Sequence, residues 1–581
     1  MKYWCPNDWS NSFNHEGLLF FVQKMQEMLF HFSDDIHRAP VHNTETLARE
    51  FLDTHKEVTS GKIKKYQLKA IFEEFKYSFS RDKILRHNLG GEFVDQVSSK
   101  LNSCQEHECF DLVNYIYTTI KPNYLRWVVT YLKEHIPKGS HKQEISAGAR
   151  YWIADVIMRG YSGEFIYKYL ETVLIKEPVQ SIDILDTFFS RFDFERHKYK
   201  VYFHVSNSVV SYAEILNKRL SLQFEDDGNF GKIKPIRRYT VCYLETDAID
   251  YYTAVIKAYR QINIFFKYYR FLSNQRRYML NKMGHVFDVE NSKMYSLPIV
   301  PTGLKAIELN EDDIIVHMLD YVILGIQGRS SRSMIALDKA IELHNSALRQ
   351  QLPKDGLANL WSVLEVLCPN VGADSKLDTV LYSTLPVLQN DYFQTVFQSI
   401  NADLHSNLSE ESLSVLLSKI HGDDEIYKIA AFCLLPEYES LREECFKKWS
   451  DFPLLRDKIF NMYQLRNDKN SLFMMSNRYS QRVKWHLYRL YRARNATVHS
   501  GETYARIQVL SEHLHSYVDS IMYELAFKLS ENNALTDINS VFVDTQFLLK
   551  SKIDYFKDTG AVTSNDISVL FREYFIEPQQ Q

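Results

Sequence analysis

The most informative segment of this 581-residue chain reads Tyr491-Arg492-Ala493-Arg494-Asn495-Ala496-Thr497-Val498-His499-Ser500-Gly501. It places a permanent cation, a carboxamide and an imidazole within six positions, at Arg494, Asn495 and His499. The surrounding residues 469–501 include seven Lys or Arg residues and no Asp or Glu. Arginine offers a planar fork to phosphate oxygens, and histidine transfers protons near neutral pH. The segment therefore predicts a site that can hold and cleave a polyanion.

The spacing of this motif also constrains its backbone. Positions five apart on a straight α-helix differ by about 140° in direction, so Arg494 and His499 would not share a face. A bend, or a second copy of the motif from another chain, is needed to bring such side chains together. Ser500-Gly501 can end or bend a helix at this point. The apolar side chains expected on the buried side of the element are Leu487, Leu490 and Val498.

A second segment, Leu360-Trp361-Ser362-Val363-Leu364-Glu365-Val366-Leu367, is mostly apolar but contains one acid. Trp361 shares a helical stripe with leucines, which predicts a core position rather than a ligand contact. An acid in the middle of an apolar helix is costly unless it is paired. We expect the partner of Glu365 to be an arginine of the motif, so that Glu365 fixes the arginine fork.

The pattern Arg494-Asn495-x-x-x-His499 resembles the R-x4-6-H signature of HEPN ribonucleases, in which Asn, Asp or His commonly follows the arginine. The longer string from Leu490 to Gly501 looks most like the Apea-like HEPN branch found in phage-defence proteins. The segment Leu360–Leu367 resembles the apolar helix of that branch, with its Trp-x-x-x-Glu core. The two marks occur in the expected order, and the resemblance covers residues 330–530.

This resemblance implies a helical bundle that acts as a metal-independent endoribonuclease and needs no cofactor. An RNA 2′-hydroxyl would attack the neighbouring phosphorus, leaving a cyclic phosphate and a free 5′-hydroxyl. His499 would serve as general base or acid, Arg494 would hold the non-bridging oxygens, and Asn495 would orient the imidazole or contact the phosphate. Arg489 and Arg492 would attract the RNA backbone without reading its sequence.

The resemblance also implies a composite site in which motifs from two protomers face one groove. The chain carries one R-x4-6-H match with the sequence context of this family, so we expect a homodimer or a higher homo-oligomer. The expected interface runs along residues 478–499, with Tyr488 or Tyr491 as contacts. The N-terminal region would restrain the enzyme and sense a phage-derived trigger. Antiviral defence by abortive infection, with the enzyme acting as a toxin on RNA, is the implied function.

Two other functions remain open. A HEPN-like domain can be a non-catalytic nucleic-acid-binding or scaffold module. Alternatively, the chain is the toxin of a pair that is silenced by a nucleotidyltransferase modifying a tyrosine near the motif. Tyr504 lies five residues after His499, which departs from the tight His-x-Tyr spacing of those toxins.

Composition predicts a folded protein of several domains. A hydrophobic content of 45% is ample for packed cores, and 581 residues favour two or three domains. The net charge of −4 means that nucleic acid must be bound by local basic patches. Seven cysteines without framework spacing indicate reduced thiols. Because neither a signal peptide nor an apolar run of membrane length is found, we expect a cytoplasmic protein without membrane contact.

The periodicity of the apolar residues predicts a mainly α chain. The predicted parts are a helical N-terminal region at 1–190, a small mixed α/β unit at 195–300, the HEPN-like bundle at 312–530 and a helical tail at 531–581. Strands are predicted inside the α/β unit at 199–205, 220–224 and 239–243.

Two further segments carry residues with chemical potential. Residues 253–284 interleave seven Lys or Arg with aromatic residues, a pattern that can bind single-stranded nucleic acid, although a solvated helix face is more common. Cys104-x-x-His107-x-Cys109 offers three metal ligands but no fourth at finger-like spacing. Buried thiols are therefore expected there, and no metal site is predicted from the sequence.

Overall fold

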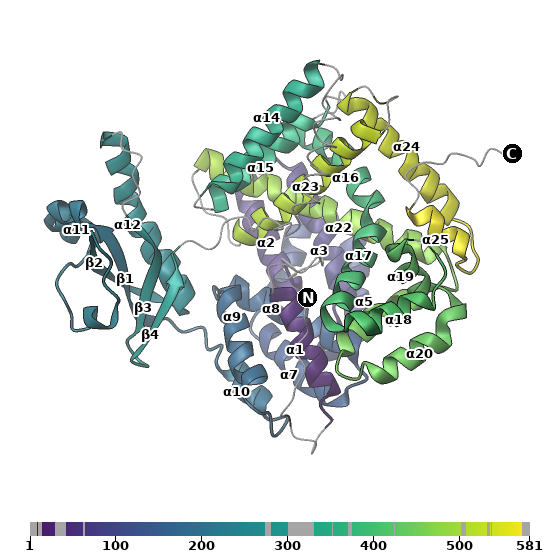
Figure 1. Ribbon diagram of the computed structural model, residues 1–581, viewed down its shortest axis with the longest axis horizontal. Helices are drawn as coiled ribbons and strands as arrows, with labels where there is room; N and C mark the ends of the chain where they lie inside the picture. The colour runs from purple at the N-terminus through teal and green to yellow at the C-terminus, as the bar shows by residue number, and fades with distance from the viewer. Residues whose placement is uncertain are drawn as a thin grey trace. The chain divides into compact units, whose positions relative to one another are not determined.

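The chain folds into a mainly helical protein, and the residues that the structure describes include one small sheet. The computed structural model describes residues 9, 14–29, 42–61, 64–273, 280–299, 331–350, 353–369, 375–422, 424–500, 507–531, 535 and 537–571. Contacts divide the chain into a larger unit, Met1–Asp155 with Pro178–Ile182 and Leu304–Gln581, and a smaller unit, Val156–Glu177 with Asp183–Gly303 (Figure 1). The predicted mainly α fold class is confirmed. The N-terminal and C-terminal helical regions, which we expected as separate domains, belong to one unit.

The smaller unit is built on an antiparallel sheet with the strand order β2-β1-β3-β4. Its strands are β1 (His197–Ser206), β2 (Tyr239–Ala248), β3 (Leu280–Asp288) and β4 (Lys293–Pro298). The alternation at 199–205 correctly predicted β1, and the long helix α12 (Tyr251–Ser273) packs against β1, β2 and β3. The remaining helical elements described here are α9 (Gly163–Leu170), the π-helix η2 (Glu171–Lys176), α10 (Ile184–Ser190), η3 (Asn207–Tyr212), α11 (Ala213–Leu220) and η4 (Phe230–Lys232).

The strand predicted at 220–224 is wrong. Helix α11 ends at Leu220, and Ser221 adopts a left-handed conformation with φ of 56°. Only Gln223 then pairs with the sheet, through an isolated bridge to Tyr243. The apolar alternation of this segment is therefore used at a helix end rather than along a strand.

The N-terminal half of the larger unit consists of helices of up to 17 residues, and side chains cap the N-termini of some of them. They are α1 (Glu16–Leu29), α2 (Thr44–Thr59), α3 (Tyr66–Arg81), α4 (Lys83–Leu89), α5 (Gly91–Ser103), α6 (Glu106–Ile120), α7 (Tyr124–His135), η1 (Ile136–Lys138) and α8 (Lys142–Met158). Asn43 caps α2 with a capping box, and the buried Asp82 caps α4 through the backbone amides of Ile84 and Leu85. These caps fix where α2 and α4 begin.

The C-terminal half of the larger unit surrounds the long helix α22 (Asn470–Asn495). Its other elements are α14 (Ser331–Leu348), α15 (Pro353–Leu367), α16 (Lys376–Asn390), α17 (Tyr392–Asn407), α18 (Glu410–Ser418), α19 (Glu425–Leu434), η5 (Pro436–Tyr438), α20 (Glu439–Lys448), α21 (Pro453–Tyr463), η6 (Ala496–Ser500), α23 (Ile507–Glu531), α24 (Ile538–Phe556) and α25 (Ser564–Phe571). Helix α22 contacts α3, α15, α16, α17, α23 and α24 (Figure 1). The motif helix is thus the central helix of its unit.

Polar contacts hold the two halves of the larger unit together. The fully buried Gln23 of α1 donates to the carbonyl of Asp451 at 2.7 Å and accepts from the amide of Leu454 at 3.2 Å, at the start of α21. Arg456 of α21 also pairs with Glu16 at 2.9 Å. In none of the helices that the structure describes is there a stretch long and apolar enough to cross a membrane.

Candidate active site

The motif lies where helix α22 ends. After Asn495 the backbone continues directly into η6, a π-helix of Ala496–Ser500. Hydrogen bonds of a π-helix join residues five apart rather than four, so the turn widens immediately after Arg494. The backbone departs from a straight α-helix at the place where the five-residue spacing required it. The side chains of His499 and Ser500, and all of residues 501–506, lie outside the described part of the structure.

Arg494 is held at this helix end by two polar neighbours. Its Nη2 lies 3.7 Å from Oε2 of Glu365, and its Nη1 donates to Oδ1 of Asn495 at 3.1 Å. The side chains of Arg494 and Glu365 are 21% and 17% exposed, so both remain partly accessible to solvent. The expected pairing of Glu365 with an arginine of the motif is present, and that arginine is Arg494.

Trp361 positions Glu365 from the core side. Its Nε1 donates to Oε1 of Glu365 at 3.0 Å, while its ring is fully buried, as expected for a core residue. The ring lies 5.3 Å from the ring of Tyr491, measured between centroids. A continuous set of contacts therefore runs from the core tryptophan of α15 through Glu365 to Arg494.

Arg489 and Arg492 do not face solvent, and their expected role in attracting RNA is corrected. Both are buried, at 2% and 3% exposure. Arg489 donates through Nε and Nη2 to both carboxylate oxygens of Glu50 and also pairs with Glu74. Arg492 donates to the same Glu50 through Nη2. Guanidinium groups enclosed and paired in this way cannot reach an RNA backbone, so they fasten α22 to α2 and α3.

The electrostatics of Glu50 reflect this enclosure. Burial alone would raise the pKa of Glu50, but the charges of Arg489, His42 and Arg492 hold it well below its usual value. Glu50 is therefore ionised at neutral pH. His42 contributes through Nε2, which lies 3.2 Å from Oε2 of Glu50.

The basic segment at 469–501 therefore offers much less unpaired positive charge to a polyanion than its sequence indicates. Acids from elsewhere in the chain pair with Arg489, Arg492 and Arg494, and Lys469 lies 4.0 Å from Asp566. The exposed Arg478 and the half-buried Lys484 instead line a shallow groove of about 270 Å³. The aromatic rings of Tyr77 and Trp485 line the same groove.

A larger cavity of about 580 Å³ lies between the N-terminal helices and α22. Its lining includes Arg489 and Glu74 together with the buried His486. Nδ1 of His486 lies 2.9 Å from the hydroxyl of Tyr517, and its Nε2 lies 3.3 Å from Nδ1 of His513. Burial lowers the pKa of His486 well below its usual value, so this imidazole is neutral at physiological pH.

Sequence reasoning missed Glu50, Glu74, His42 and His486 as neighbours of the motif. Glu50 and Glu74 precede Arg489 by 439 and 415 residues, and neither lies in a sequence motif that predicts a function. The unbroken absence of acids in 469–501 was the available signal, because buried arginines in such a segment must find carboxylates elsewhere.

Tyr488 and Tyr491, the contacts expected at a dimer interface along α22, pack on rings of the same chain. Helices of the same chain cover this helix, Tyr491 packs on Trp361, and Tyr488 packs on Tyr66 with 6.5 Å between centroids. Val498, expected on the buried side, is 51% exposed. The end of the motif, from Arg494 to Val498, is thus half-buried to exposed.

The structure also describes parts of the basic and aromatic segment at 253–284 and of the segment Cys104-x-x-His107-x-Cys109. In the basic and aromatic segment at 253–284, the end of α12 exposes Tyr268 and Phe271, at 67% and 77%, near the exposed Lys267. Sγ of Cys104 lies 3.0 Å from Sγ of the buried Cys109, and both are free thiols. The side chain of His107 lies outside the described part of the structure.

Comparison of the chain with protein-family models, with curated proteins and with solved structures gives no match.

Proposed function

We propose that the larger unit is a metal-independent endoribonuclease of the HEPN type that acts in antiviral defence. The observation that carries the proposal is the support of Arg494 by Glu365, Trp361 and Asn495, directly before the widened turn at position 499. A guanidinium fixed in orientation and partly open to solvent is suited to the non-bridging oxygens of a phosphodiester.

In the proposed reaction the two ends of the motif have separate tasks. His499 takes the proton from the 2′-hydroxyl or gives one to the leaving 5′-oxygen, since a histidine pKa near 6.5 suits proton transfer at neutral pH. Arg494 stabilises the negative charge that grows on the phosphate in the transition state. Asn495 keeps the guanidinium in place through its amide oxygen.

The backbone of the RNA needs cations other than Arg489 and Arg492. We assign this task to Arg478 and Lys484, because they line a groove beside the half-buried ring of Tyr77. Trp485 also lines this groove, but it is only 6% exposed and packs on Tyr77. Cations that contact phosphates, combined with aromatic rings on which bases stack, are typical of single-strand binding. Replacing either cation with alanine should weaken binding of all sequences and reduce the salt dependence by about one charge.

A composite groove requires a second protomer at the end of α22. Each chain supplies one Arg494 and one His499, and the exposed Val498 lies between them. Mixing Arg494→Ala chains with His499→Ala chains should restore part of the cleavage if each groove takes one intact group from each chain. Cleavage by a chain that light scattering shows to be monomeric at micromolar concentration would contradict the composite site.

The direct experiment uses purified protein, end-labelled single-stranded RNA and excess EDTA. Arg494→Ala and His499→Ala should each slow cleavage by about 10² to 10⁴ without loss of fold. Matched controls are Arg126→Ala, which removes an exposed arginine that is likewise held by an asparagine at 2.7 Å, and His405→Ala, which removes a histidine that is 54% exposed. Cleavage that all four variants retain would refute the proposal.

A non-catalytic helical module is the second candidate, and the burial of Arg489 and Arg492 favours it because it leaves fewer cations for RNA. Phage protection that survives His499→Ala would select this alternative.

A further inference from the structure

Three metal-ligating side chains converge between α14 and α23. Nε2 of His344 lies 2.9 Å from Nε2 of His515 and 2.9 Å from Oδ1 of Asp519. Nε2 of His515 lies 3.4 Å from Oδ2 of Asp519. Among the described residues these form a group of His, Cys, Asp or Glu side chains whose ligand atoms all lie within 4.8 Å of one another.

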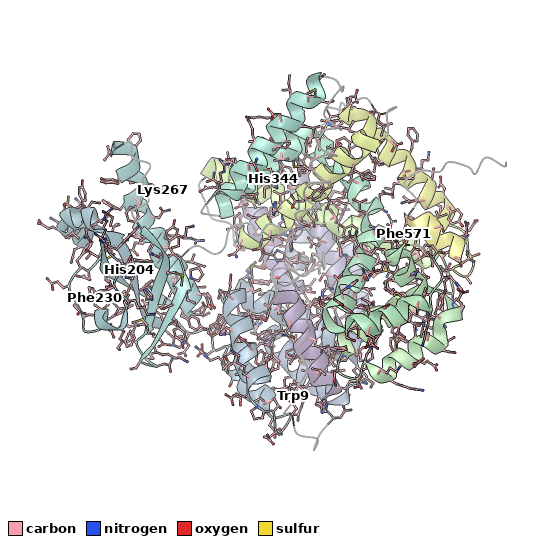
Figure 2. The ribbon with its side chains drawn as sticks, in the orientation of Figure 1. Trp9, His204, Phe230, Lys267, His344 and Phe571 are labelled. Carbon is pink, nitrogen blue, oxygen red and sulfur yellow. The ribbon has the colours of Figure 1, made fainter. Side chains whose placement is uncertain are left out.

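The fold brings these side chains together from distant parts of the sequence. His515 and Asp519 are four apart on α23, so they share one face of that helix. His344 lies on α14 (Figure 2), 171 residues before His515 and 175 before Asp519. His515 is 6% exposed, while the side chains of His344 and Asp519 are 17% and 24% exposed. The cluster is therefore enclosed on one side and open on the other.

The distances match those of a coordination shell. Zinc binds imidazole nitrogen and carboxylate oxygen at about 2.0–2.2 Å, so neighbouring ligands of a tetrahedral ion lie roughly 3.3 Å apart. The two imidazole nitrogens lie 2.9 Å apart, and they approach different oxygens of Asp519, Oδ1 at 2.9 Å and Oδ2 at 3.4 Å. These separations are close to the tetrahedral value, and with one ligand atom taken from each residue all three atoms lie within 4.8 Å of one another.

Hydrogen bonding alone satisfies this arrangement poorly. The two histidines direct the same ring nitrogen, Nε2, at each other, and Nε2 of His344 also meets the carboxylate. If each Nε2–H points to one oxygen of Asp519, the two nitrogens lie 2.9 Å apart with no hydrogen bond between them. If instead one Nε2 accepts from the other, the accepting nitrogen has no N–H for Asp519.

We propose that His344, His515 and Asp519 bind one divalent transition-metal ion, with Zn²⁺ as the preferred ion. Two imidazoles and one carboxylate are a known ligand set for such ions, and a fourth position stays open to water or to a further ligand. The bound ion joins α14 to α23, and both of these helices pack against α15, which carries Trp361 and Glu365. The ion therefore braces the helix that orients Arg494.

This inference does not rest on the proposed ribonuclease activity, and its test needs no RNA. Untagged full-length protein, purified without chelator, is analysed for metal by mass spectrometry and then titrated with Co²⁺ after metal removal. We expect about one ion per chain and the visible absorption of four-coordinate Co²⁺. Wild-type protein that carries no stoichiometric metal and binds Co²⁺ without this absorption would overturn the proposal, whatever the variants do.

Variants then locate the ion. His344→Ala and Asp519→Asn should lose the bound metal and the Co²⁺ spectrum, and Zn²⁺ should no longer raise their melting temperature. The matched control is His405→Ala, because His405 also lies against a carboxylate, with Nε2 2.6 Å from Oε1 of Glu425. Equal metal content in His344→Ala and His405→Ala would place the ion elsewhere and overturn the assignment. If His344→Ala does not fold, Asp519→Asn and the wild-type spectrum still decide.

Discussion

Replacing Glu50 with glutamine removes one negative charge from the buried contact between α2 and α22. Glutamine keeps the shape of the side chain, so the substitution tests charge rather than packing. Removing one partner of a buried ion pair costs roughly 3–5 kcal/mol, because the other charge stays buried without compensation. Here Glu50 serves two arginines whose exposures are 2% and 3%.

The two arginines do not depend on Glu50 equally. Arg489 retains Glu74 as a second carboxylate. Among the ion pairs of the described residues, Arg492 pairs with no acid other than Glu50. Its buried Nε and Nη1 also have no hydrogen-bond partner among these residues. We therefore expect a loss of about 4–5 kcal/mol, in the upper half of that range.

Thermal unfolding followed by tryptophan fluorescence measures this loss. An unfolding entropy of roughly 2.1 cal/mol/K per residue in a unit of about 440 residues converts this loss to about 4–5 °C in Tm. The control is Asp53→Asn on the same helix, since Asp53 and its partner Lys56 are 65% and 72% exposed. Its effect should stay within about 0.5 kcal/mol. Equal shifts for the two variants would refute the buried-network reasoning.

Four further predictions follow from the same contacts. Because the pKa of Glu50 is lowered in the folded protein, the ionised Glu50 stabilises the fold fully above pH 4.5, the ordinary pKa of a glutamate, and this stabilisation is lost as the pH falls toward the folded pKa. When Tm is measured against pH, the difference in Tm between wild type and Glu50→Gln should therefore shrink, not widen, below about pH 4.5. In Glu365→Gln the side chain can still accept from Trp361 but loses the charge that faces Arg494. We therefore expect kcat to fall while the free energy of unfolding, measured by thermal melting, changes by only about 1 kcal/mol or less. Full activity would show that the charge is not needed. Trp361→Phe keeps the ring in the core but removes the Nε1 donor, so activity should fall more than after Tyr382→Phe, an exposed aromatic control. Cleavage measured in EDTA should persist below the melting temperature of the metal-free protein, even if chelation lowers that temperature; loss of cleavage without loss of fold would contradict metal-independent chemistry.

Helical periodicity and strand alternation predicted much of the fold. The strand predicted at 199–205 is found as β1, and the region predicted as a helical bundle at 312–530 is helical over most of its described residues, including α14, α22 and α23. Alternation failed at 220–224 because a left-handed Ser221 ends a helix there, which no apolar pattern reports. Local patterns also cannot show that α1 packs on α21, so the union of the two helical regions in one unit was not predictable.

The candidate site was predictable in its local parts only. The cost of a lone acid on an apolar helix was enough to predict that Glu365 would pair with a motif arginine. The same reasoning, applied to each arginine of the acid-free segment, would have asked which distant carboxylates neutralise Arg489 and Arg492. Sequence alone does not identify them, since Glu50 and Glu74 are more than 400 residues away and unremarkable in context. Burial, not charge, separates the arginines that hold the helix from Arg494.

The most direct test of the central claim is the chemistry of RNA ends made by this chain in cells. Wild type, His499→Ala and the control His405→Ala are expressed to equal levels, and RNA fragments are sequenced by a method that captures 5′-hydroxyl ends and 2′,3′-cyclic phosphates. We predict new ends of both kinds with wild type and with His405→Ala, and none with His499→Ala. Identical end profiles for wild type and His499→Ala would contradict the assignment of a ribonuclease site to the end of α22.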